Sequence, residues 1–130
     1  MLGAGRYPIT VAELRSYSED ADKLFGEEEH DRLKEHLAFL PDSGDMLAGT
    51  GGVRKLLWPY KDRRGRSREA LILYFFRDLN MPLYLLSVFA SGNIEFDDPW
   101  RDEMAKLVAR LVAEHGKQWA RVLGKPDTRA

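Results

Sequence analysis

A run of positive charge is the feature of this sequence with the clearest chemical meaning. Between Arg54 and Arg68 only Asp62 is acidic, and the stretch has a net charge of +6 (7 − 1). Its basic residues are Arg54, Lys55, Lys61, Arg63, Arg64, Arg66 and Arg68. The whole chain has a net charge of −1, so the excess is local and predicts a surface that attracts phosphate groups, as in RNA. The alternative is a solvated loop without a ligand, because charge runs commonly keep a loop in water.

Aromatic residues accompany the charged run. Trp58 and Tyr60 flank Pro59 at the expected end of a strand, so we expect their rings to be exposed and able to stack on bases, at about 1–3 kcal/mol per base. Tyr74 lies in an apolar strand and is expected to be structural. The predicted RNA-binding residues are therefore Trp58, Tyr60, Lys61, Arg63, Arg64 and Arg66.

Several other kinds of site are disfavoured by the composition. The chain has no cysteine, which excludes disulfides, thiolate metal sites and a cysteine nucleophile. Its three histidines, His30, His36 and His115, are far apart in the sequence, so we expect no metal centre. The glycine-rich segment 49–52 lacks the Lys-Ser/Thr pair of a nucleotide-binding P-loop and precedes an expected strand rather than a helix. We expect no metal and no cofactor.

The elements around the run are those of one α+β domain. The 130 residues suit a single domain over residues 7–123, between a disordered start (1–6) and a frayed tail (124–130). Apolar spacing predicts helices over 14–25 and 27–40 and from residue 98 onward. Strands are predicted over 7–11, 53–58, 70–76 and 83–90, with a polar connection over 59–69. Together they predict a twisted, mostly antiparallel sheet with two N-terminal helices and a C-terminal helix.

Nothing in the sequence predicts a membrane protein. The longest strongly apolar run, residues 71–76, is far shorter than the ~20 residues that a membrane span needs. The first six residues lack the charged start and apolar middle of a signal peptide. We therefore expect a cytoplasmic protein with no membrane partner.

One segment resembles a known protein family. Residues 44–56 read Gly-Asp-Met-Leu-Ala-Gly-Thr-Gly-Gly-Val-Arg-Lys-Leu, which is similar to the Gly-Asp-…-Gly-Thr-Gly-Gly-Leu-Arg-Lys signature of HigB-like toxins in the RelE superfamily. The similarity continues as a pattern through the basic run and the strands 71–78 and 82–86, and covers residues 7 to about 115. It implies a microbial ribonuclease fold, a twisted sheet backed by helices.

The resemblance also implies an activity and partners. Such toxins are ribosome-dependent endoribonucleases that cut messenger RNA in the A site of the small subunit, and a helix-turn-helix antitoxin protein neutralises them. The reaction needs no metal: a 2′-hydroxyl attacks the adjacent phosphorus, and basic side chains stabilise the charge that develops. Arg54 and Lys55 match the basic pair of the family, and Arg68, or alternatively Arg66, is expected to take the place of an arginine that members carry where this chain has Leu71.

Departures from the family pattern leave other functions open. Leu71 and Ser91 stand where members usually have basic residues, and Phe89 has no proton to donate. A catalytically impaired RelE-fold binding module is therefore one alternative, and an inhibitor of DNA gyrase, like the ParE members of the superfamily, is another. The antitoxin is expected to dock either on the basic run or on an apolar helical stripe that ends at Trp119.

Overall fold

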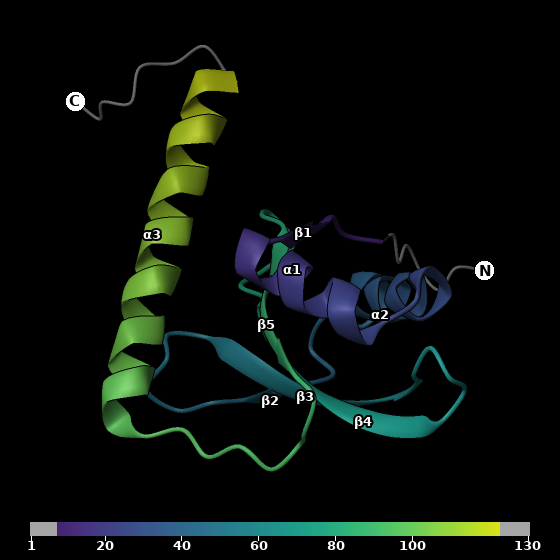
Figure 1. Ribbon diagram of the computed structural model, residues 1–130. Coiled ribbons are helices and arrows are strands. Elements are labelled where there is room, and N and C mark those ends of the chain that lie inside the picture. Colours follow the sequence, from purple (N-terminus) through teal and green to yellow (C-terminus); the bar gives the residue numbers. More distant parts are fainter. Residues whose placement is uncertain (1–7, 123–130) are drawn as a thin grey trace.

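The computed structural model of the protein describes residues 8–122, and side chains as far as residue 117. The expected start (1–6), Tyr7, the expected tail (124–130) and the side chain of Trp119 lie outside the described residues. Within the described part the chain is an α+β structure, as the sequence predicts, with a five-stranded sheet and three helices (Figure 1).

The sheet is mixed but mostly antiparallel. Its strands are β1 (Val11–Glu13), β2 (Asp45–Met46), β3 (Val53–Lys61), β4 (Ser67–Phe75) and β5 (Leu83–Phe89), in the spatial order β1-β5-β4-β3-β2. β1 runs parallel to β5, and the other three pairs are antiparallel. The long β3–β4 hairpin pairs nine residues on each strand, from Val53 opposite Phe75 to Lys61 opposite Ser67.

The helices cover opposite faces of the sheet. They are α1 (Arg15–Leu24), α2 (Glu27–Phe39) and α3 (Asp98–Val122), and α3 lies across the sheet from the other two (Figure 1). Because side chains alternate along a strand, even-numbered residues of β3 and β4, such as Ile72, pack with α1 and α2. Odd-numbered residues, such as Leu73, pack with Val108 of α3. The sheet thus separates two apolar cores.

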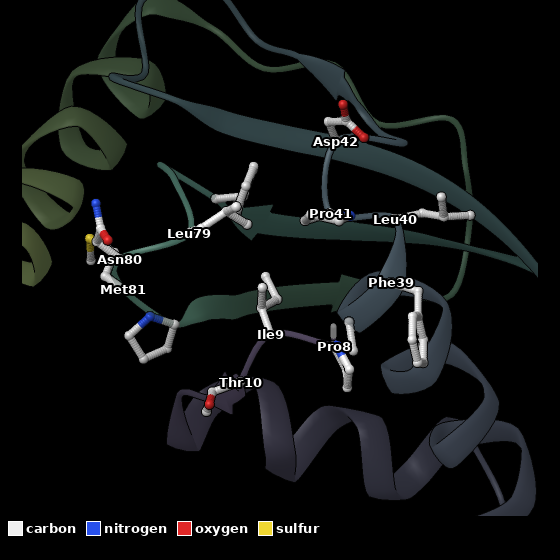
Figure 2. Close-up of a pocket in the computed structure, with 13 residues that line it drawn as sticks. Pro8, Ile9, Thr10, Phe39, Leu40, Pro41, Asp42, Leu79, Asn80 and Met81 are labelled. Atoms are coloured by element: carbon white, nitrogen blue, oxygen red, sulfur yellow. The ribbon is translucent and has the colours of Figure 1, made fainter. Parts of the chain in front are cut away.

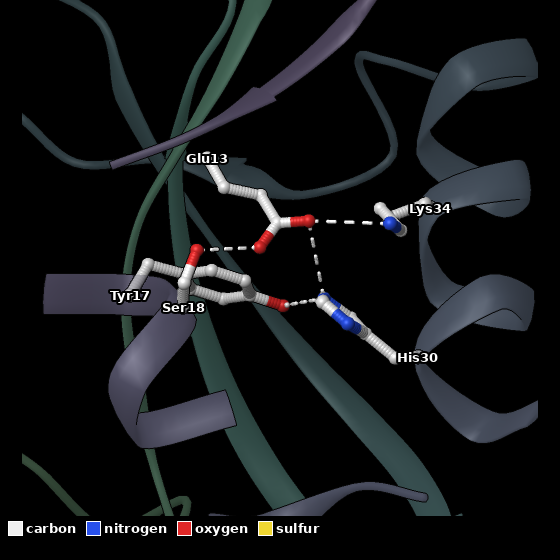
Figure 3. Close-up of polar contacts among 5 residues, drawn as sticks. All are labelled: Glu13, Tyr17, Ser18, His30 and Lys34. Carbon is white, nitrogen blue, oxygen red and sulfur yellow. Dashed lines mark hydrogen bonds and ion pairs between the residues drawn. The ribbon is translucent and has the colours of Figure 1, made fainter. Parts of the chain in front are cut away.

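A polar network ties the first two helices to β1 (Figure 3). Glu13 accepts hydrogen bonds from Ser18 Oγ at 2.7 Å and from Lys34 Nζ at 3.2 Å. His30 Nε2 lies 3.8 Å from the Glu13 carboxylate and 3.1 Å from the Tyr17 hydroxyl. Burial raises the pKa of Glu13, but these hydrogen bonds and the nearby His30 and Lys34 charges outweigh it, and the net pKa is lowered. The carboxylate therefore stays charged and holds α2 beside α1 and β1.

The outer edge of β3 is covered by side chains of α2 beyond the short β2. β2 pairs only with Arg54 and Lys55. Farther along the edge, Arg32 Nη2 donates to the carbonyl oxygen of Pro59 at 2.9 Å, and the amide of Lys61 donates to Glu29 Oε2 at 3.1 Å. Side chains of helix α2 therefore form the hydrogen bonds that a neighbouring strand would form at this edge.

Three expectations about the elements are wrong in detail. The first strand is Val11–Glu13 rather than residues 7–11, and the strand β2 was not expected. The residues 59–69 are not a polar connection, because β3 continues to Lys61 and β4 begins at Ser67. Pro59 fits inside β3 because it lies on the edge, where its missing N–H breaks no hydrogen bond to a neighbour strand.

Candidate nucleic-acid interface

The tip of the β3–β4 hairpin gathers the basic run around one carboxylate. Asp62 Oδ1 accepts the backbone amides of Arg64 and Arg66, both at 2.9 Å, and Gly65 has the positive φ of 84° that the tight turn requires. Arg68 Nε donates to Asp62 Oδ2 at 3.0 Å. The amide of Arg66 and the side chain of Arg68 are the main causes that lower the Asp62 pKa to about 2. Asp62 is thus a charged anchor that shapes the turn.

The remaining basic side chains of the tip divide into bound and unbound groups. Arg63 Nη2 donates to the carbonyl oxygens of Asp22 at 2.7 Å and Phe25 at 2.9 Å. These carbonyls are at the C-terminal end of α1, where a cation satisfies unpaired oxygens and opposes the helix dipole. Arg64 and Arg66 are exposed, and in the described part of the chain their side chains have no hydrogen bond or ion pair. They are the cations best placed to meet an external phosphate.

The expectation that Trp58 and Tyr60 stack on RNA bases is contradicted by their burial. Their exposed fractions are only 6% and 5%. Both are even-numbered residues of the long β3, so they point toward α1 and α2. Arg32 lies over the Trp58 ring at 4.6 Å, and the Tyr60 ring meets Phe25 edge-on at 4.8 Å. The rings are core residues, and nucleobases have no access to their faces.

The three residues predicted to be catalytic do not converge on one point. Arg54 Nη1 donates to the carbonyl oxygens of Asp42 at 3.3 Å and Gly44 at 2.8 Å on the α2 side. Lys55, the next residue of the same strand, projects to the opposite face and is exposed. Arg68 of β4 lies opposite Tyr60 of β3 in the strand register, and Tyr60 is six residues from Arg54. Arg54 and Arg68 are therefore about 20 Å apart along the strand direction. Their catalytic role stays a prediction.

Leu71, which stands where the resemblance leads one to expect an arginine, is part of the packed core. Leu71 is only 1% exposed and pairs with Leu57 on one side and Phe89 on the other. The segment after β5 passes close by, since a Cβ added at Gly92 would lie 2.9 Å from Leu57 Cδ2. The same Cβ would lie 3.1 Å from Glu69 Oε1, so Leu71 has apolar strand neighbours and an acidic side chain nearby. No basic side chain approaches Leu71 among the contacts described.

The glycine-rich segment that carries the resemblance has a structural role. Thr50 is fully buried; its hydroxyl donates to the Leu47 carbonyl at 2.7 Å and accepts from the Val53 amide at 3.0 Å. Gly49, Gly51 and Gly52 all have positive φ. A Cβ at Gly52 would lie 2.9 Å from Phe75. The motif therefore shapes a tight loop rather than a phosphate cradle.

Helix α3 holds this loop in place from the other face of the sheet. Arg101 Nη1 donates to the carbonyl oxygen of Ala48 at 2.6 Å. A Cβ at Gly51 would lie 3.5 Å from Val108. The segment thus positions the start of β3, and with it Arg54 and Lys55.

Three residues beside the hairpin tip, Lys23, Leu24 and Ala90, were missed by the sequence analysis. Lys23 of α1 and Ala90 at the end of β5 line a hollow of about 340 Å³ together with residues of the tip. Its full lining is Lys23, Leu24, Tyr60, Asp62, Arg63, Arg64, Arg66, Arg68 and Ala90. The acid-rich sequence around Lys23 gives no sign that it joins a basic cluster; only the packing of α1 on the sheet brings it there.

A larger hollow elsewhere has the opposite character. A groove of about 730 Å³ lies between residues 8–10, the end of α2 and the segment before β5 (Figure 2). Phe39, Leu40 and Leu79 contribute its exposed apolar surface, and Asp42 is the one charged residue in its lining. Such a surface has no attraction for a polyanion, so the hairpin tip is the better candidate for a nucleic-acid interface.

The described residues hold neither a membrane-spanning helix nor a cluster of metal-ligating side chains. None of the helices within residues 8–122 is both long and apolar enough to cross a membrane. The same residues contain no group of three or more His, Cys, Asp or Glu side chains that could hold a metal ion. No protein-family model matches this sequence.

Proposed function

We propose that this protein is a RelE-type toxin domain that binds messenger RNA on the ribosome through the tip of the β3–β4 hairpin. The observation that carries the proposal is the pair of exposed guanidinium groups, Arg64 and Arg66, without an ion-pair partner in the described structure. They lie beside Lys61 and Arg68 on a protein whose net charge is −1. A concentrated cationic tip attracts the RNA backbone without requiring base recognition.

The arrangement of elements supports the family part of the proposal. Two N-terminal helices, a mostly antiparallel sheet and a C-terminal helix occur in the order that the resemblance to HigB-like toxins implies. The glycines and the threonine of the Gly-Thr-Gly-Gly segment form a tight loop. The segment precedes Arg54 and Lys55, as in the family signature. The proposal includes a partner, a helix-turn-helix antitoxin protein that binds this domain and neutralises it.

RNA binding can be tested by its dependence on salt. The Arg64→Gln, Arg66→Gln double variant should bind a single-stranded RNA oligonucleotide more weakly, and the slope of log K against log salt should fall by about 1.4, since each phosphate contact on a single strand contributes about 0.7. Arg77→Gln with Lys106→Gln removes the same charge at exposed positions outside the tip and should leave the slope unchanged. Equal slopes for both double variants would contradict the proposal.

Whether the domain also cleaves the RNA that it binds needs its own assay. The geometry favours the binding module over the nuclease, because Arg54 is engaged by backbone carbonyls and lies about 20 Å from Arg68 along the strand. Primer extension on translating ribosomes distinguishes the two. Cleavage by the wild type that disappears in Lys55→Ala would establish a nuclease. RNA binding without cleavage would establish the binding module.

The antitoxin contact can be tested with charge-reversal variants of the tip. Arg64→Glu with Arg66→Glu is preferable to changes at Arg63, because Arg63 holds the end of α1. If the basic tip docks an acidic antitoxin segment, these changes should weaken the complex and flatten its salt dependence. A complex that survives unchanged at low and high salt would exclude the tip as the docking surface.

A further inference from the structure

We infer that the hollow between α1 and the hairpin tip is a binding site for the phosphate group of a nucleotide. The inference rests on the proposed function only as far as RNA is the source of that phosphate. The site lies on the α1–α2 side of the sheet, because Tyr60 and the end of α1 line it. Lys55 projects to the other face of the sheet, so this site is separate from any chemistry at Lys55.

The charge of the hollow suits a phosphate. Its lining holds five cations, Lys23, Arg63, Arg64, Arg66 and Arg68, and one carboxylate, Asp62, which leaves a net charge of +4 (5 − 1). Arg63 satisfies the carbonyl oxygens at the end of α1, so the negative end of that helix is covered where an anion would enter. A terminal phosphate carries a charge of about −1.5 to −2 at neutral pH and accepts several charge-assisted hydrogen bonds.

Tyr60 provides a hydrogen-bond donor in the same hollow. Its ring is held by Phe25, but its hydroxyl has no hydrogen-bond partner in the described structure. Among the described residues, the side-chain polar atoms that are both fully buried and without a partner are Arg54 Nε and Trp58 Nε1. The Tyr60 hydroxyl is not one of them, so it is in contact with solvent and is accessible to a ligand. Burial is the main cause that raises the Tyr60 pKa, and the hydroxyl therefore keeps its proton and can donate it to a phosphate oxygen.

The size of the hollow fits a small ligand. At about 340 Å³ it lies near the lower end of the range of small-molecule sites, about 300–1,000 Å³. This volume accommodates a phosphate with the sugar that carries it. Leu24 and Ala90 supply short apolar walls beside the charged groups, an arrangement typical of a site that holds the ligand by a few polar contacts.

Calorimetry with adenosine 5′-monophosphate, inorganic phosphate and adenosine tests the site directly. The two phosphates should bind, whereas adenosine should not. Tyr60→Phe keeps the ring and removes the hydroxyl. It should lower the affinity for adenosine monophosphate by about tenfold, the usual value of a hydrogen bond to a charged group. Lys23→Gln should also weaken binding. Absence of phosphate binding, or binding that neither variant changes, would overturn the inference.

Matched controls exist for both variants. Tyr84→Phe makes the same chemical change on the α3 side of the sheet. Lys106→Gln breaks an i,i+3 ion pair with Glu103, just as Lys23→Gln breaks one with Asp20. Both controls should bind the phosphates like the wild type, and thermal unfolding of all four variants shows whether the fold is intact. Equal losses in variants and controls would overturn the inference.

RNA oligonucleotides with a 5′-phosphate and with a 5′-hydroxyl identify the source of the phosphate. Tighter binding of the phosphorylated strand indicates a chain end, and equal binding that Tyr60→Phe weakens indicates an internal phosphodiester; both support the site. If the binding of RNA and of adenosine monophosphate are both insensitive to Tyr60→Phe and Lys23→Gln, the site is overturned and the proposed function stands. Binding of adenosine monophosphate without any binding of RNA supports the phosphate site and contradicts the proposed function.

Discussion

Thr50 is the residue whose replacement tests the structural reading of the glycine-rich motif most sharply. Its buried hydroxyl bridges the two ends of the loop, as donor to the Leu47 carbonyl and acceptor from the Val53 amide. Thr50→Val keeps the shape of the side chain and removes both hydrogen bonds. A buried polar group left unpaired costs about 1–3 kcal/mol, so the loss of both bonds should lower the free energy of unfolding by about 2–4 kcal/mol.

The measurement is urea unfolding followed by circular dichroism, with Thr50→Ser as the control. The serine variant keeps the hydroxyl and loses one buried methyl group, at a cost of about 1 kcal/mol. Thr50→Val should shift the urea midpoint by roughly 1–2 M relative to the wild type for a slope of about 2 kcal/mol/M. Equal stability of the two variants, or a valine variant within about 0.5 kcal/mol of the wild type, would refute the role given to this hydroxyl.

Three more predictions concern stability. Gly52→Ala should destabilise the fold more than Gly65→Ala, since only the Cβ at Gly52 meets Phe75; equal melting temperatures would contradict this. Burial lowers the pKa of His30 below its ordinary 6.5, so the unfolded chain binds a proton first and stability should fall as pH drops below about 6.5. That fall should be smaller in His30→Gln. Arg63→Gln should cost about 1–2 kcal/mol by uncapping α1, and denaturant unfolding that matches the wild type would exclude this cap.

The helices and the central strands could be predicted from the sequence because their signals are local. Residues such as Leu33 and Leu37 repeat at helical spacing and are fully buried, and the apolar run of β4 is a central strand. The two-residue β2 has no such signal, since its pairing depends on a loop that is closed by Thr50. A stretch of two residues is too short for any periodicity to appear.

The basic run can be read from the sequence, but the expected exposure of its two aromatic residues is wrong. Pro59 was interpreted as the end of a strand, so Trp58 and Tyr60 were expected in solvent. The structure continues β3 past the proline, because α2 supplies Arg32 to its carbonyl and covers Trp58. That contact joins residues 27 apart in sequence, and no local pattern reveals it. The opposite projection of Arg54 and Lys55, in contrast, follows from strand alternation alone.

The cover on the edge of β3 has a consequence for self-association. An uncovered strand edge is a template on which another copy of a protein can add a strand, the first step toward cross-β aggregates. Here Pro59 has no N–H to offer, its carbonyl is taken by Arg32, and the Lys61 amide is taken by Glu29. A polypeptide arriving at this edge beyond β2 finds Leu57 as the main residue with which to pair. The fold thereby protects the outer edge of this long hairpin from pairing with a second copy of the protein.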